Sequence, residues 1–293
     1  MELNNSRLTT LQNCGERFRR LYVEGEVEPT SPQAIRGSAV HHVARIALRR
    51  KLVRREVERL TTPDTTGYQA NTALPSLEEA QDLAATEFER RWQAAEMRVM
   101  DTQEDGGATL AQARAESKDA AVKLAGLHVT VVAPGIDPIY VERKITVKPQ
   151  HSDLVIHGTL DLVARESVPL APLRVIRDLK SGRKAPRRDA ADTSQQLSVY
   201  GLISAAEAGV FADGLALDHL YKTPTGHLRY VEQRTTRDMA DFEAIVNRLN
   251  TATQAIEKGI YIPADSSSWF CNAKYCGFYA SCPYTRRSKR PTS

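Results

Sequence analysis

Two aspartates and a lysine are the residues of this sequence whose types and spacing could do chemistry. Asp161 lies in the apolar run DLVIHGTLDLVARE, and Asp178 and Lys180 close the next run, LRVIRDLKSG. Residues two apart on a strand share a face, so Asp178 and Lys180 should point the same way, and pairing of the two strands would bring Asp161 beside them. Two buried carboxylates need a cation between them, and Mg²⁺ accepts such ligands. The pattern predicts a metal-activated water, a nearby lysine and hydrolysis of a phosphodiester.

The acidic-x-Lys spacing is weak by itself because two other segments share it. Glu116–Lys118 falls in a predicted helix, where residues two apart do not share a face. Glu142–Lys144 falls in a predicted strand, but no hairpin carboxylate precedes it. Only the third triplet has both the strand and the upstream Asp161, and surface charges at strand ends remain an alternative explanation for it.

Three further side chains could join this site. His41 lies in the first turn of a helix that Gly37 opens, with His42 as an adjacent competitor for the same role. Gln196 and Tyr200 are four residues apart and share one face of the helix that follows the lysine strand. Taken singly, each of these residues is more often a detail of packing.

The four cysteines form a second group. Cys14 lies near the start of the chain, and Cys271, Cys276 and Cys282 lie near its end. Disulfides are improbable in a cytosolic chain, where clustered cysteines more often bind metal. Four thiolates could hold zinc or an iron–sulfur cluster, and cysteines that bind nothing are the third alternative.

The composition indicates a cytoplasmic globular protein. Of 293 residues, 41% are hydrophobic and 26% are charged, and 40 Lys and Arg against 36 Asp and Glu give a net charge of +4. No stretch approaches the roughly 20 apolar residues of a membrane span, and the polar start lacks an apolar signal-peptide core. We expect no membrane contact, and the mild basicity permits nucleic acid as a partner.

The first 126 residues should be mostly helical and the following ones a mixture of strands and helices. Helices are predicted at 6–24, 38–60, from a capping box at Ser76 and Glu79 to about 100, from about 107 to 126, at 192–208 and at 238–258. A loop is predicted at 61–75. Strands are predicted at 128–132, 140–147, 153–164, 173–178, 214–222 and 228–233.

Basic residues gather on one predicted helix and one predicted loop. The helix at 38–60 carries Arg45, Arg49, Arg50, Lys51, Arg54, Arg55 and Arg59. The loop after the lysine strand carries Arg183, Lys184, Arg187 and Arg188. Each set could be solvated or could contact phosphates, and the loop is our candidate DNA-binding segment. The basic tail from Arg286 onward is expected to be disordered.

Taken in order, these pieces resemble the PD-(D/E)XK nuclease superfamily in its RecB-like branch. The ordered series is Gly37-x3-His41, Gly158-x2-Asp161, Asp178-Leu179-Lys180 and Gln196-x3-Tyr200. The resemblance covers about residues 6–284 and implies an α/β fold of the restriction-endonuclease type, in which helices flank a central mixed β-sheet. It implies one domain over 1–293, with a helical part and insertion to about 126, a nuclease core at about 127–260 and a cysteine-rich segment at about 261–285.

The resemblance also implies a role for each site residue. Mg²⁺ or Mn²⁺ would be held by Asp161, Asp178, His41 and the backbone carbonyl of Leu179. Lys180 would help to activate the water and stabilise the transition state, and Gln196 and Tyr200 would support the site or touch DNA.

One N-terminal and three C-terminal cysteines are similar to the arrangement in iron–sulfur nucleases, namely the AddB nuclease domain and the CRISPR-associated Cas-four exonucleases. The resemblance implies a 4Fe–4S cluster that joins the chain ends, with zinc as the alternative. The predicted function is a metal-dependent DNA exonuclease acting on single strands from a free end, with 5′ to 3′ favoured, in recombination, repair or phage DNA metabolism. Two alternatives stay open: a non-catalytic DNA-binding protein, and a nuclease defined by its partners in CRISPR adaptation.

Overall fold

The six strands form one mixed β-sheet. A computed structural model describes residues 2–60, 72–97, 107–149, 154–167, 169 and 171–285. The strands are β1 (Glu2–Leu3), β2 (Asp137–Val147), β3 (Val155–Glu166), β4 (Leu173–Gly182), β5 (Gly214–Lys222) and β6 (Leu228–Thr235). Their order is β1-β3-β4-β5-β6, with β2 on the other edge of β3. β1 and β3 are parallel, as are β4 and β5, and the remaining pairs are antiparallel.

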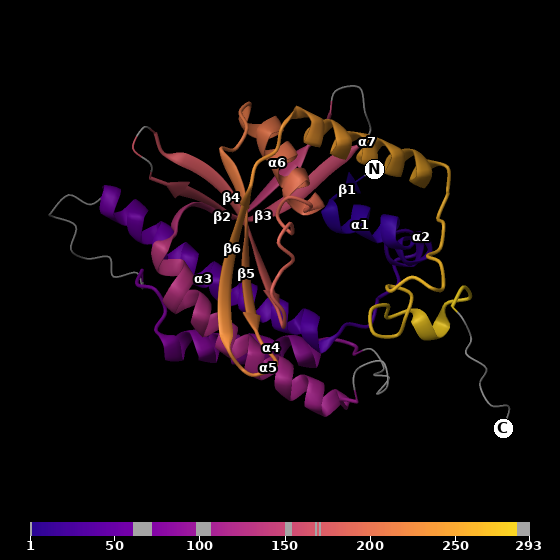
Figure 1. Cartoon of the computed structure of the whole chain (residues 1–293), viewed down its shortest axis with the longest axis horizontal. Helices are drawn as coiled ribbons and strands as arrows, with labels where there is room; N and C mark the ends of the chain where they lie inside the picture. The colour runs from indigo at the N-terminus through magenta and orange to yellow at the C-terminus, as the bar shows by residue number, and fades with distance from the viewer. Residues whose placement is uncertain are drawn as a thin grey trace.

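Helices cover both faces of the sheet (Figure 1). One layer consists of α3 (Pro32–Leu60), α4 (Leu77–Ala94) and α5 (Leu110–Leu127), and its core includes Val43, Leu124 and Leu162. The other layer consists of α1 (Asn5–Asn13), α6 (Gln195–Ala208) and α7 (Met239–Glu257), and its core includes Leu160, Leu197 and Leu249. Short turns of helix complete the described chain: α2 (Gly15–Phe18), η1 (Arg19–Val23), η2 (His128–Val132), η3 (Ala133–Gly135) and η4 (Tyr279–Ser281).

The predicted architecture is confirmed in outline, with one wrong assignment. Residues 128–132, predicted as a strand from their β-branched side chains, form the π-helical turn η2 that continues α5. His128, Val129 and Val132 are buried while Val131 is exposed, which is the i, i+1, i+4 stripe of a helix and not the alternation of a strand. Burial of that stripe against α3 overrides the strand propensity of the segment.

Other boundaries move by a few residues. The predicted helix at 6–24 is broken at Cys14, whose backbone is extended, and the helix predicted at 38–60 begins at Pro32. Ser76 caps α4 by accepting a hydrogen bond from Glu79 N, but the Glu79 carboxylate pairs with Arg50 and leaves the capping box half formed. The helix predicted to reach about residue 100 ends at Ala94. Most of the predicted loop at 61–75 and the basic tail lie outside the described residues.

A buried ion-pair network fixes β4 against β5 and β6. Arg177 donates to Asp218 at 2.7 Å, and the Tyr230 hydroxyl donates to the same carboxylate at 2.7 Å. Arg177 and Asp218 are almost fully buried, so a mismatch of the strands would leave a buried charge unpaired at a large cost in free energy. This network therefore secures the register of β4, the strand that carries Asp178 and Lys180.

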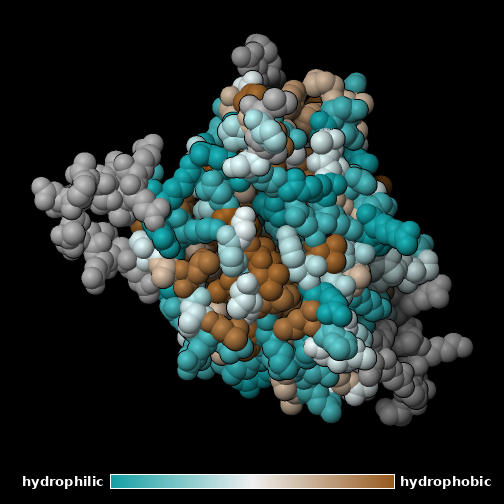
Figure 2. Space-filling view, turned by 60° about the vertical axis from the view of Figure 1, so that its left-hand side comes forward, coloured by the Kyte–Doolittle hydropathy of each residue, from teal (hydrophilic) through white to brown (hydrophobic). Residues whose placement is uncertain are grey.

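No helix within the described ranges is long and apolar enough to cross a membrane. Figure 2 shows one face of the molecule as largely hydrophilic, with hydrophobic residues gathered near its centre.

The buried His128 should make the protein sensitive to acid. Burial lowers the pKa of His128 to about 4 in the folded chain, whereas in the unfolded chain its pKa is near 6.5. Between these two pH values the unfolded chain therefore binds a proton that the folded chain does not bind. The unfolding free energy should therefore fall, by about 2 kcal/mol from this group, as the pH drops from 7 to 4.5. Denaturant titrations should show that His128→Leu reduces this acid sensitivity, whereas a change of the exposed His227 does not. Equal acid sensitivity in wild type and His128→Leu would contradict the prediction.

Candidate active site

The site lies where β3 leaves β4. The two strands pair only from Leu162 opposite Arg177 to Glu166 opposite Leu173, and β1 pairs with β3 only at Val155 and Ile156. Among the described strands, none pairs with residues 157–161 of β3 on this edge. Asp161 fills the gap, because its Oδ2 accepts a hydrogen bond of 3.0 Å from Leu179 N in place of a strand partner. The parting strands thus present Asp161 toward the residues that follow Asp178.

Gly158 permits a helix to approach this gap. A Cβ at Gly158 would lie 2.7 Å from Ile203 Cδ1 and 3.3 Å from Tyr200 Cε1, both on α6. Ser194 caps α6 by accepting a hydrogen bond from Leu197 N, which fixes where the helix starts. The glycine of the Gly158-x2-Asp161 motif is therefore explained by close packing of α6 on β3.

Asp178, Lys180 and Gln196 form one connected polar group. Lys180 Nζ lies 2.7 Å from Asp178 Oδ2 and donates to Gln196 Oε1 at 2.7 Å. Gln196 Nε2 donates to Asp178 Oδ1 at 2.8 Å and to the Tyr200 hydroxyl at 2.7 Å. The structure therefore brings together all four residues that the sequence predicted on the strand and the helix face.

Asp178 is poised between its charged and neutral forms. Burial, with only 1% of the residue exposed, raises the pKa of Asp178 to about 6, and the nearby Asp161 raises it further while Lys180 opposes the shift. Burial also raises the pKa of the Tyr200 hydroxyl, and the charge of Asp178 adds to that effect. A perturbed carboxylate beside a lysine is typical of a functional site.

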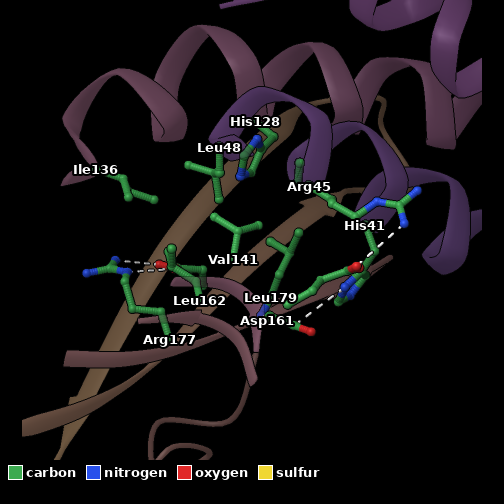
Figure 3. Close-up of a pocket in the computed structure, with 13 residues that line it drawn as sticks. His41, Arg45, Leu48, His128, Ile136, Val141, Asp161, Leu162, Arg177 and Leu179 are labelled. Atoms are coloured by element: carbon green, nitrogen blue, oxygen red, sulfur yellow. Dashed lines mark hydrogen bonds and ion pairs between the residues drawn. The ribbon is translucent and has the colours of Figure 1, made fainter. Parts of the chain in front are cut away.

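His41 joins this group from α3, and His42 does not. His41 Nδ1 lies 3.4 Å from Asp161 Oδ2, and Figure 3 shows His41 and Asp161 directed toward each other beside Leu179. His42 points elsewhere: its Nδ1 lies 2.7 Å from an Arg45 nitrogen and 3.8 Å from Glu87 Oε1. Of the two adjacent histidines, the one with the family spacing reaches the carboxylate.

The sequence prediction passed over one further carboxylate near this site, Glu142. Along β2, Val141 packs on the α3 side of the sheet whereas Ile145 packs on the α6 side. Along β3, Leu162 packs on the α3 side and Leu160 packs on the α6 side. Residues an even number apart should share a face, so both strands turn over between these positions. The register places Glu142 opposite Asp161 at the turnover, and the φ of Glu142 is +50°.

The turnover gives Glu142 access to the same hollow as the predicted site. Glu142, His41 and Asp161 all line a cavity of about 30 Å³ between α3 and the sheet. The Glu142–Lys144 triplet had been set aside because no carboxylate precedes it along the chain. Its partner carboxylate lies on the following strand instead, and only the antiparallel register reveals this.

The residues present fit a divalent cation. As the side chains stand, no three His, Cys, Asp or Glu groups in the described ranges are arranged to hold a metal ion. Asp178 Oδ2 is nevertheless buried without a partner of hydrogen-bond geometry, although Lys180 Nζ pairs with it by charge. A hard cation beside Asp178 and Asp161 would satisfy that oxygen and relieve the repulsion between the two carboxylates.

The cysteines converge where the two ends of the chain meet. Gly15 N donates to Ile262 O at 2.7 Å, and Figure 1 shows the C-terminal segment beside α2. Burial raises the pKa of Cys271, and the charges of Cys282 and Cys14 raise it further. Burial also raises the pKa of Cys276 to about 11. The raised pKa keeps the Cys271 and Cys276 thiols protonated at neutral pH unless a bound metal displaces their protons. All four cysteines are half-buried, although as the described side chains stand no three of them are arranged to hold a metal ion.

The basic loop after β4 is held by contacts with α5 and β6. Arg183 pairs with Glu116 of α5 at 3.2 Å, and Arg187 pairs with Asp189 at 3.4 Å. The backbone carbonyls of Arg187 and Arg188 accept hydrogen bonds from Gln233 of β6. Arg183, Lys184, Arg187 and Arg188, all within the described part of the chain, do not line the hollows at Asp161 and Lys180.

The comparison with protein families decides the family. A model described as the PD-(D/E)XK nuclease superfamily matches residues 2–283. The chain belongs to this superfamily. Its members are nucleases that typically use a divalent metal, and membership implies a DNA substrate.

This PD-(D/E)XK nuclease is similar to two solved structures. A candidate exonuclease from Eubacterium rectale shares 10% identity and a TM-score of 0.47, over 100% of this chain and 91% of that one. SSO0001 shares 17% identity and a TM-score of 0.35, over 81% of this chain and 94% of that one. No curated protein matches the chain.

Metal binding should depend on the protonation of Asp178. Because its pKa is about 6, metal-free Asp178 carries a proton below pH 6 and cannot act as a charged ligand. Mg²⁺ should raise the Tm of the wild type at pH 7.5, and this increase should fade as the pH falls through 6. Asp178→Asn should abolish the increase at every pH, whereas Asp119→Asn, which changes a carboxylate paired with Lys123 and Lys222, should retain it. A Mg²⁺ effect that persists in Asp178→Asn would show that the cation binds elsewhere.

Proposed function

We propose that this nuclease is a metal-dependent deoxyribonuclease whose catalytic group is Asp161, Asp178 and Lys180. The observation that carries the proposal is the polar group on β4 and α6, in which a buried carboxylate of raised pKa is linked to a lysine both directly and through Gln196. A purely structural ion pair of Asp178 with Lys180 would gain nothing from a second carboxylate, Asp161, beside it. The arrangement instead suits a site that must hold a cation and place a lysine over a phosphate.

The side chains divide the work of hydrolysis. When bound, Mg²⁺ or Mn²⁺ supplies an activated water and neutralises charge on the phosphate. Asp161, Asp178, His41 and the carbonyl of Leu179 are the groups that would hold it. Lys180 is 39% exposed, so its ammonium reaches the cleft and can stabilise the negative charge that develops on the phosphate. Gln196 and Tyr200 are positioning residues, because Gln196 fixes Lys180 and Tyr200 fixes Gln196.

The finer assignment places the enzyme in the RecB-like branch as an exonuclease on single-stranded DNA, with 5′ to 3′ favoured. Support comes from the ordered motif series, from His41 reaching Asp161 across the layers, and from α6 supplying Gln196 and Tyr200. Recombination, repair or phage DNA metabolism would employ such an activity.

DNA hydrolysis should be lost when Lys180 is replaced and retained when Lys118, which has the same acidic-x-Lys spacing, is replaced. Lys180→Ala should lower the rate of DNA hydrolysis in Mn²⁺ by on the order of 10²–10³, because a preorganised charge at the phosphate is removed. Lys118→Ala is the matched control: it lies in the same acidic-x-Lys spacing but pairs with Glu89 on the helical layer, and should be nearly silent. The assay compares end-labelled linear single strands with circular ones. Equal cutting of both would contradict the exonuclease assignment, and full activity of Lys180→Ala would contradict the catalytic one.

We further propose that the four cysteines hold a 4Fe–4S cluster, with zinc as the alternative. The support is their convergence at the junction of α2 with the C-terminal segment, where Gly277 N also donates to Glu28 at 2.9 Å. A metal group there would cross-link segments more than 250 residues apart and restrict the unfolded chain.

Protein purified without oxygen should therefore be brown from thiolate–iron charge transfer. Replacing any one of Cys14, Cys271, Cys276 and Cys282 by Ser should bleach the colour and lower the Tm, because each ligand joins the two chain ends. Iron and zinc content measured on anaerobic protein decides between the metals. One zinc per chain without iron would support the alternative, and a colourless, metal-free protein of unchanged Tm would remove both.

A further inference from the structure

A cleft next to the catalytic group is lined by basic residues whose arrangement the proposed chemistry does not use. It measures about 410 Å³ and lies between α3, α4 and the end of β4. Lys180 and His41 border it on the catalytic side, and Arg45, Arg91 and His42 border it on the helical side. Among the described residues that line it, Glu142 is the single carboxylate. The cleft therefore opens directly onto the catalytic group and is positive overall.

A buried glutamate organises the helical side of the cleft. Glu87 on α4 is 5% exposed, and its pKa is lowered to about 2, chiefly by its hydrogen bond from Arg90. Arg91 Nε donates to Glu87 Oε1 at 2.7 Å, so the carboxylate holds the guanidinium by its inner nitrogen. A buried carboxylate is costly unless it is paired and hydrogen-bonded, and Arg90 and Arg91 supply these partners.

The outer face of Arg91 is left available by this contact. Within the described chain, its only hydrogen bond is the one from Nε, and its side chain is 43% exposed in the cleft wall. The two terminal nitrogens of an arginine form a fork that matches two oxygens of a phosphate. Arg91 is thus a preoriented donor pair for which the described residues supply no acceptor beyond the one at Nε.

Arg45 faces the same space from α3. It lies one turn after His41 on the same helix face, with a nitrogen 2.7 Å from His42 Nδ1 and another 3.5 Å from Glu142. Because a guanidinium can only donate, His42 Nδ1 is the acceptor of this hydrogen bond. The contact with Glu142 is at the limit of a hydrogen bond, so Arg45 remains able to bind an anion.

Three other basic residues of α3 are engaged away from the cleft. Arg50 pairs with Glu79 at 2.5 Å, and Lys51 donates to the backbone carbonyls of Ala133 and Pro134. Arg55 pairs with Asp137 at 3.1 Å. Arg45 therefore lines the cleft while these neighbours stabilise the helical layer.

A neighbouring hollow is lined by acidic residues and disfavours anions. It lies on the other side of His42 and Glu87 and is lined by the carboxylates of Glu78, Glu79, Asp82 and Glu87. A polyanion would be repelled there and attracted to the cleft, because a region lined by one sign of charge favours ions of the opposite sign. The charges thus mark one path for a strand, along α3 from Lys180 to Arg91.

We propose that Arg91 and Arg45 form a phosphate subsite, which binds a backbone phosphate of the DNA strand next to the one that is cleaved. The inference rests on the proposed nuclease function and adds the helical layer to its substrate-binding surface. Glu87 is a positioning residue that acts through Arg91. The subsite reads the backbone only, so it binds without regard to base sequence.

The test is the affinity for a fluorescein-labelled oligo-dT strand, measured by anisotropy in EDTA so that no strand is cut. Arg91→Ala should weaken binding about 10-fold and lower the log–log salt slope by slightly less than one. The matched control is Arg90→Ala, which removes the neighbouring charge from the same Glu87 but changes a residue that does not line the cleft. Its affinity should stay within about 2-fold of wild type, as expected for a solvated charge. Equal losses of affinity in Arg91→Ala and Arg90→Ala would show that only the net charge of the protein matters, and would overturn the subsite.

Glu87 is tested by a double-mutant cycle. Glu87→Gln should weaken binding in the wild type but not in Arg91→Ala, because its effect passes through Arg91. Additive losses in the folded variants, verified by circular dichroism, would contradict the positioning role. The failure of the subsite can be told from the failure of the nuclease assignment. If only the subsite is wrong, the wild type cuts DNA in Mn²⁺ and Arg91→Ala binds DNA as tightly as the wild type. If the nuclease assignment is wrong, the wild type does not cut DNA.

Discussion

One hydrogen bond, from Leu179 N to Asp161 Oδ2, is the interaction on which the arrangement of the site depends. Strand pairing between β3 and β4 has already ended at Leu162, so this side chain replaces the missing backbone acceptor. Because the bond ties Asp161 to the residue between Asp178 and Lys180, the two carboxylates cannot drift apart when the strands separate. The buried ion pair of Arg177 with Asp218, one residue before Asp178, holds β4 from its other side. A site built on parting strands is therefore rigid although it is open.

The two helical layers contribute different things to this frame. The layer with α6 supplies Gln196 and packs so closely on β3 that only glycine fits at position 158. The layer with α3 and α4 supplies His41 and the basic wall of the cleft. The α6 layer thus positions the catalytic residues of the sheet, and the layer of α3 and α4 adds His41 and forms the wall of the cleft that leads to them. The basic loop after β4 is attached to β6 through Gln233, outside the residues that line the cleft.

Sequence reasoning reached the parts of the site that depend on local geometry. The period of two on a strand placed Asp178 beside Lys180, and the period of four on a helix placed Gln196 beside Tyr200. It failed where the outcome depends on distant packing. Residues 128–132 have strand-forming side chains, yet burial of one stripe makes them helical. The sequence does not single out Glu142, because its partner carboxylate follows it in the chain. It does not single out Glu87 either, because the contacts of Glu87 with Arg91 and His42 exist only once α3 and α4 have packed.

The joint turnover of β2 and β3 has a consequence for how such a sequence can change in length. Both strands reverse their faces at Glu142 and Asp161 while the register across them is kept. Deleting one residue from either strand would send every side chain beyond it to the opposite face and carry the buried residues into water. Length changes within the pair are therefore tolerable only in compensating combinations. Length changes beyond the paired residues of the two strands are under no such restriction, because they shift no side chain of the ladder.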